Sequence, residues 1–103
     1  MPTPILKLGK KEYKPKKPKL KLWRQIVRLN ERGADLANEA AFDDMLAVVC
    51  LAYDNPGVTP EALEEHLDID EFLPHFSRLT EWVGNILAGK LEQLPNAETP
   101  ADA

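Results

Sequence analysis

The sequence is poor in the residues that most often build metal and redox sites. Its 103 residues include one cysteine, Cys50, and two histidines, His66 and His75. A single cysteine cannot form an internal disulfide, and its place within an apolar helical pattern predicts a buried, structural thiol. The histidines stand nine residues apart on different predicted helices, which is not the spacing of metal ligands. The sequence therefore predicts no metal site and no cofactor.

Catalytic motifs are also absent. The chain has no Gly-rich phosphate loop and no nucleophile elbow. Carboxylates cluster between Glu64 and Glu71, but this segment lacks the Gly and the terminal Glu of an EF-hand calcium loop. The cluster is better explained as a solvated face or a docking patch. Because a chain of this length also buries only a small core, we expect a protein that is not an enzyme.

Long apolar runs are missing as well. No run approaches the roughly 20 residues that a membrane-spanning helix requires. The residues Met1–Pro4 lack the charged and apolar regions of a secretory signal. We therefore expect a cytoplasmic protein without a membrane segment.

Charge, in contrast, is abundant and unevenly divided. Seven of the twelve residues from Lys10 to Lys21 are lysines; residues 1–32 carry a net charge of +9 and residues 33–103 one of −13. Such a division indicates either a basic arm for nucleic acid or association of the basic part with the acidic 61–71 surface of a neighbouring copy. The lysine run contains no Arg, which specific readers of bases favour, and the whole chain is acidic. Binding to nucleic acid is therefore the less favoured alternative.

Apolar periodicity predicts a mainly α-helical fold, a small bundle of about four helices with a short N-terminal β-hairpin. Two short runs around Gly9 predict the hairpin at residues 4–15. Apolar residues at helical spacing predict helices at about residues 19–32, 39–53, 60–67 and 71–88.

Local signals set the ends of these helices. Asn38 and the pair Thr59-Pro60 are strong helix starts, Pro74 fits only in the first turn of the last helix, and Gly89 is the predicted stop. We therefore expect one small domain over residues 1–89. Residues 90–103 are expected to form a flexible tail.

Two tryptophans lie on the apolar stripes of the first and last predicted helices. Core packing is the usual role of such residues, but four short helices offer limited cover, and an exposed Trp marks a binding groove. We predict a partner-binding groove between these two helices, with Trp23 and Trp82 as its anchors. Its walls are predicted to be Leu22, Ile26, Phe76 and Val83, and its polar rim Arg24 and Arg28.

The order of five parts along residues 5–88 is distinctive. They are the hairpin Leu6–Tyr13, the Leu-Trp-Arg of the first helix, the run Phe42-Asp-Asp-Met-Leu, the segment Val58–Leu67 and the run Asp70-Glu-Phe-Leu-Pro. This order resembles the tail assembly chaperones of long-tailed bacteriophages and prophages.

The resemblance implies a non-enzymatic protein that binds the tape measure protein and keeps it soluble until tail tube subunits polymerise around it. Tape measure proteins are long, helical and rich in apolar stripes, so an apolar groove rimmed by charge suits them. The tail tube protein is the second implied partner, and the finished virion is not expected to contain the chaperone. A generic protein-interaction adaptor with the same helical bundle remains a further alternative.

Overall fold

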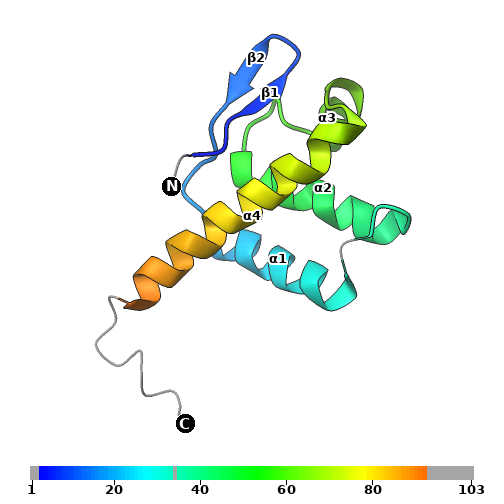
Figure 1. Ribbon diagram of the computed structural model, residues 1–103. Helices are drawn as coiled ribbons and strands as arrows, with labels where there is room; N and C mark the ends of the chain where they lie inside the picture. Colours follow the sequence, from blue (N-terminus) through cyan, green and yellow to red (C-terminus); the bar gives the residue numbers. More distant parts are fainter. Residues whose placement is uncertain (1–2, 34, 93–103) are drawn as a thin grey trace.

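The computed structural model describes residues 3–33 and 35–92, a mainly helical body with a two-stranded antiparallel hairpin (Figure 1). The elements are β1 (Leu6–Leu8), β2 (Lys11–Tyr13), α1 (Leu20–Arg32), α2 (Glu39–Tyr53), α3 (Pro60–His66) and α4 (Ile69–Glu92). The predicted fold class, a helical fold with a short N-terminal β-hairpin, is confirmed. Most of the predicted tail, residues 93–103, lies outside the described residues.

The hairpin follows the alternation of its sequence. Its register pairs Leu6 with Tyr13, Lys7 with Glu12 and Leu8 with Lys11. Leu6 and Leu8 are buried and Lys7 is exposed, because successive side chains of a strand lie on opposite faces. Gly9 turns the chain with a φ of 64°, a left-handed conformation that glycine adopts without steric cost. The hairpin thus adds two leucines to the core.

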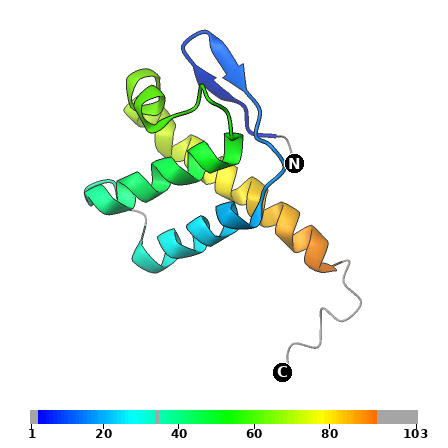
Figure 2. The same ribbon diagram turned by 180° about the vertical axis from the view of Figure 1, so that it is seen from behind.

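α2 supplies the centre of the core, and α1 packs beside it in the antiparallel direction (Figures 1 and 2). The residues of α2 with no exposed surface are Met45, Val48, Val49 and Tyr53. α1 contributes the buried stripe Leu22, Ile26 and Leu29. An ion pair joins the two helices, with Arg32 Nε 2.9 Å from Asp44 Oδ2.

The ends of α1 and α2 are set by short-range backbone signals. Gly33, with a φ of 94°, ends α1 and donates its N–H to the carbonyl of Leu29 at 2.7 Å. Asn38 caps α2 by accepting the N–H of Ala41 at 3.0 Å. At the other end of α2, Asp54 adopts a left-handed conformation with a φ of 46°. Both bounds of α2 therefore match the prediction.

α4 starts earlier than its sequence predicted. The carbonyl of Asp68 accepts the N–H groups of Glu71 at 3.1 Å and Phe72 at 3.2 Å, so the helix begins at Ile69. Pro74 is consequently the sixth residue of the helix and not part of its first turn. Because proline has no N–H, it cannot donate to the carbonyl four residues earlier, which belongs to Asp70. Asp70 is exposed, so water can replace the missing donor.

α4 also ends later than predicted. The stop expected at Gly89 is not observed, since the helix continues to Glu92. Glycine ends a helix when it adopts a left-handed conformation, and the described glycines with positive φ are Gly9 and Gly33. The predicted tail from residue 90 therefore begins as the last turn of this helix.

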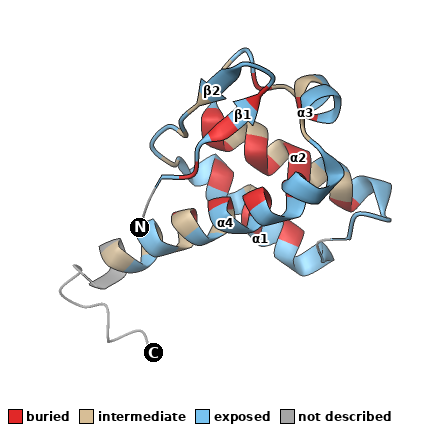
Figure 3. Ribbon diagram, turned by 45° about the horizontal axis from the view of Figure 1, so that its top comes forward, coloured by how far each residue is buried: buried red, intermediate tan, exposed pale blue. Residues whose placement is uncertain are grey.

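α4 crosses the α1–α2 pair diagonally and its C-terminal part extends beyond them (Figures 1 and 2). Buried residues lie on the helix faces that are turned toward one another, and the outward faces are exposed (Figure 3). Along α4, Leu79 and Val83 are buried, whereas Ile86 one turn later is exposed. The core thus ends before the helix does.

Candidate functional site

The described part of the chain contains one cysteine and two histidines. Its His, Cys, Asp and Glu side chains form no group of three or more that could hold a metal ion. Among its helices, none has the length and hydropathy needed to cross a bilayer.

Burial raises the pKa of the half-buried Cys50 thiol, and the charge of Glu61 acts in the same direction. A raised pKa makes this thiol a poor nucleophile at neutral pH.

The residues predicted as walls of a groove lie in the core. Leu22 and Ile26 of α1 are 1% and 6% exposed, and Phe76 and Val83 of α4 are 8% and 3% exposed. They lie on the apolar stripes that α1 and α4 turn toward the core. In the folded chain these four side chains offer little surface to a partner. Their role in binding stays a prediction.

The two predicted anchors occupy different settings. Trp23 is exposed, as are Arg24 and Arg28 on the same helix. Trp82 is half-buried and packs against the core. In the described residues, aromatic ring contacts involve Phe, Tyr and His side chains but neither tryptophan. The structure therefore does not bring Trp23 and Trp82 together as a stacked pair.

Trp23 belongs to a second apolar stripe on α1. Leu20, Trp23 and Val27 are spaced i, i+3 and i+7, so they share one side of the helix, and they are 86%, 36% and 37% exposed. With Lys21 and Arg24 they line a shallow hollow of about 510 Å³. We call these five residues the outer α1 face. It is an apolar surface with a positive rim.

The sequence analysis missed this face because it merged two stripes into one. At about 100° per residue, Leu20, Trp23 and Val27 fall on one arc of the helix. The buried set Leu22, Ile26 and Leu29 falls on another, roughly 120° away. Plotting both sets by angle separates them, but the sequence alone does not say which set is buried.

A second apolar surface opens where the start of α2 meets α3 and the start of α4. A pocket of about 290 Å³ there is lined by Leu36, Phe42, Leu46, Leu63, Glu64, Leu67, Asp68, Ile69 and Phe72. Ile69 is 89% exposed and Leu36 is 39% exposed. Glu64 and Asp68 are also exposed, so the mouth of the pocket is negative. We call this site the acidic pocket.

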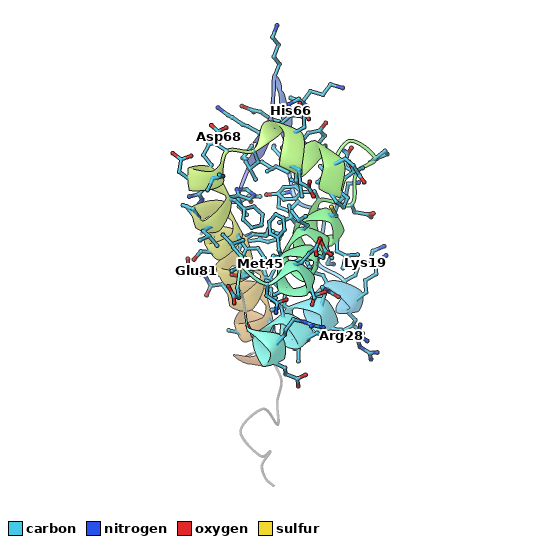
Figure 4. All side chains as sticks on the ribbon, turned by 90° about the vertical axis from the view of Figure 1, so that its right-hand side faces the viewer. Lys19, Arg28, Met45, His66, Asp68 and Glu81 are labelled. Atoms are coloured by element: carbon cyan, nitrogen blue, oxygen red, sulfur yellow. The ribbon has the colours of Figure 1, made fainter. Side chains whose placement is uncertain are left out.

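The acidic pocket and the outer α1 face are separate surfaces. Their linings share no residue, and in Figure 4 Asp68 of the acidic pocket and Arg28, the residue that follows the outer α1 face, lie on opposite sides of the molecule. The sequence analysis identified the carboxylates between residues 64 and 71 as a solvated face or docking patch. It did not predict the apolar floor beside them, because that floor is assembled from three helices.

One member of the lysine run has an internal role. The backbone N–H of Lys16 donates to the carbonyl of Ala52, and its Nζ donates to the carbonyl of Asp54, both at 2.9 Å. These carbonyls lie at the C-terminal end of α2, where unpaired acceptors and the helix dipole favour a cation. Across the hairpin, Lys7 Nζ lies 3.6 Å from the carboxylate of Glu12, an exposed pair of small energetic weight.

Comparison with known protein families finds a match over residues 4–98 to the family described as phage tail chaperone protein. Neither the curated proteins nor the solved structures contain a match. The matched residues include the hairpin, α1 to α4 and both apolar surfaces described above. Proteins of this family are not enzymes. Since the match covers far more than half of its length, the chain belongs to the phage tail chaperone family.

Proposed function

We propose that this chain binds the tape measure protein and holds it in solution until tail tube subunits assemble around it. Membership of the phage tail chaperone family supports a role in tail assembly. The observation that carries the finer proposal is the outer α1 face, where an exposed tryptophan lies between two exposed aliphatic side chains. Side chains at this spacing pack well against the apolar stripe of a partner helix.

Trp23 is the proposed anchor, because binding energy is concentrated in a few large aromatic side chains. Lys21, Arg24 and Arg28 form a basic rim that favours helices with acidic flanks. Trp82, half-buried at the edge of the core, is proposed as a second contact. Four further residues of the predicted groove support these helices from inside the core, namely Leu22, Ile26, Phe76 and Val83.

The tail tube protein is the second proposed partner. As tube subunits cover the tape measure protein, they compete for the same apolar stripes and displace the chaperone. The proposed place of action is therefore the host cytoplasm, and the finished virion contains no copy of this chain. Self-association through the basic hairpin region and the acidic 61–71 surface is proposed as a further property.

Co-expression with the cognate tape measure protein tests the proposal. The expected result is a soluble tape measure protein when the wild-type chain is present and an insoluble one when it is absent. Trp23→Ala should lower the soluble fraction while circular dichroism shows unchanged helix content. Leu73→Ala is the matched control, since it removes another exposed apolar side chain, 47% exposed, from α4. A tape measure protein that is equally soluble without the chain contradicts the proposal.

A further inference from the structure

The acidic pocket has an apolar floor of fixed shape. Phe42 and Leu46 come from α2, Leu63 from α3 and Phe72 from α4, so three helices hold its walls. Phe42 and Phe72 pack edge to face with ring centroids 5.9 Å apart, which fixes the orientation of both rings. A volume of about 290 Å³ lies at the lower end of ligand pockets, which span roughly 300–1,000 Å³. It suits one bulky side chain better than a whole helix.

The mouth of the pocket exposes further apolar surface. Ile69 is the first residue of α4 and is almost fully exposed, and Leu36 is exposed on the segment before α2. Single exposed aliphatic residues are ordinary on protein surfaces. Here two of them flank an apolar pocket, so a helix laid across the mouth would contact both while its central side chain enters the floor.

The charge around the mouth has one sign. The segment 61–71 carries six carboxylates and no Lys or Arg, and two of these carboxylates, Glu64 and Asp68, line the pocket itself. A negative field of this kind attracts a basic partner and repels an acidic one. It therefore disfavours residues 93–103 of the same chain as the occupant, since their only charged side chains are Glu98 and Asp102.

We propose that the acidic pocket is a second docking site, which receives one bulky apolar side chain from a partner helix carrying Lys or Arg on the neighbouring turns. Its chemistry is the opposite of that of the outer α1 face, which has a basic rim. The two surfaces share no lining residue, so occupation of one leaves the lining of the other free. The chain thereby binds two helices of opposite charge, an acidic one at the outer α1 face and a basic one at the acidic pocket.

A synthetic helix tests this site without any tail protein. The probe is a labelled peptide of about 18 residues, or five helical turns, with one central Phe and Lys at i−4, i+3 and i+4 around it. Fluorescence anisotropy against the full chain should show saturable binding. Two matched peptides, one with Glu in place of each Lys and one with Ala in place of Phe, should bind at least about tenfold more weakly.

Variants of the chain locate the binding. Ile69→Ser and Glu64→Lys should each weaken binding of the Lys peptide by about fivefold or more. Their matched controls are Leu73→Ser, another exposed apolar residue of α4 that lines neither surface, and Glu81→Lys, the same charge change on α4 outside the pocket. Both controls should remain within about twofold of wild type.

Three results overturn the proposal. The first is no binding of the Lys peptide, and the second is equal binding of the Glu peptide. The third is self-association of the wild-type chain that persists at high salt in sedimentation and that Ile69→Ser abolishes, because a second copy then fills the pocket. The first two results do not bear on capture of the tape measure protein at the outer α1 face, so this proposal can fail while the proposed function stands.

Discussion

The hydroxyl of Tyr53 lies 2.8 Å from Nε2 of His75, and both side chains are buried between α2 and α4. The same hydroxyl donates to the carbonyl of Pro4 at 2.9 Å. A hydroxyl has one proton to donate, so with that proton on Pro4 the Nε2–H of His75 must donate to the tyrosine oxygen. His75 therefore carries a proton on Nε2, and three separate parts of the chain meet at one phenol.

The stability of the protein should fall in acid because of His75. Burial lowers the pKa of His75 to about 4, and the positive charge of Arg78 acts in the same direction. Above the pKa of an unfolded histidine, about 6.5, the titration of His75 takes nothing from the free energy of unfolding. This free energy falls as the pH decreases from there toward 4, because the unfolded chain then binds a proton that the folded chain does not. The loss amounts to at most about 3 kcal/mol.

Urea unfolding at pH 7 and pH 4.5 measures this effect. His75→Gln keeps an N–H donor but cannot titrate, so the stability difference between wild type and variant should narrow as pH falls. The carboxylates titrate in both proteins and cancel in the comparison. A difference that is constant over this range contradicts the assignment of acid sensitivity to His75.

Tyr53→Phe should destabilise the fold without creating a cavity. The change removes the partner of two buried groups, the Pro4 carbonyl and His75 Nε2, and leaving such groups unpaired costs about 1–3 kcal/mol. Chemical denaturation gives the value. In a double-mutant cycle with His75→Gln, the two losses should be clearly less than additive. Strict additivity shows that the two side chains do not interact.

Alanine substitutions at two leucines of α1 should distinguish its core face from its outer face. Leu22→Ala should cost about 2–5 kcal/mol, because Leu22 is 1% exposed. Leu20→Ala, at 86% exposure, should change stability by no more than about 0.5 kcal/mol. On α4, the buried Leu79 should behave like Leu22, as should Leu46 on α2. Thermal melts compare the four variants, and similar melting temperatures for Leu22→Ala and Leu20→Ala would mean that the faces are exchanged.

DNA should bind only weakly at physiological salt. The exposed lysines are spread over the hairpin, the segment after it and the start of α1, Lys16 is already engaged with α2, and the acidic remainder of the chain repels phosphate. We expect a Kd weaker than about 1 µM at ~150 mM salt, measured by anisotropy with a labelled duplex. Tighter binding that falls steeply with added salt restores the nucleic-acid alternative.

Self-association should depend on salt if the basic hairpin region meets the acidic 61–71 surface of a neighbour. Sedimentation at low salt should show oligomers that dissociate as salt is added, since exposed charge pairs are screened. Replacing Lys10 and Lys11 by Glu should give monomers under the same conditions. A wild-type chain that remains monomeric at high concentration and low salt rules this contact out.

Short-range signals were the most predictable part of this fold. The side chains of Asn38 and Thr59 cap α2 and α3 as expected, because a cap depends on residues within one turn. Pro74 and Gly89 were misleading, since each permits a helix end without requiring one. α4 begins where the carbonyl of Asp68 accepts the first helical N–H groups, and it continues past Gly89 because this glycine does not adopt a positive φ. Neither feature can be read from composition.

The candidate surfaces were less predictable. The apolar content of α1 was evident, but burial of Leu22 and exposure of Leu20 depend on where α2 and α4 lie. The carboxylates of residues 61–71 were likewise evident, whereas the floor beside them combines Phe42 with Phe72, thirty residues away in the sequence. A surface built from distant segments leaves no local pattern.

The contacts of Pro4 and Lys16 reach forward along the chain, to partners 49 and 38 residues later. During synthesis the hairpin therefore emerges long before α2 and the residues on which it docks. Two strands of three residues are not stable alone in water. We expect this N-terminal segment to dock last in folding and to detach first in local opening. Its amide hydrogens should accordingly exchange with solvent before those of α2.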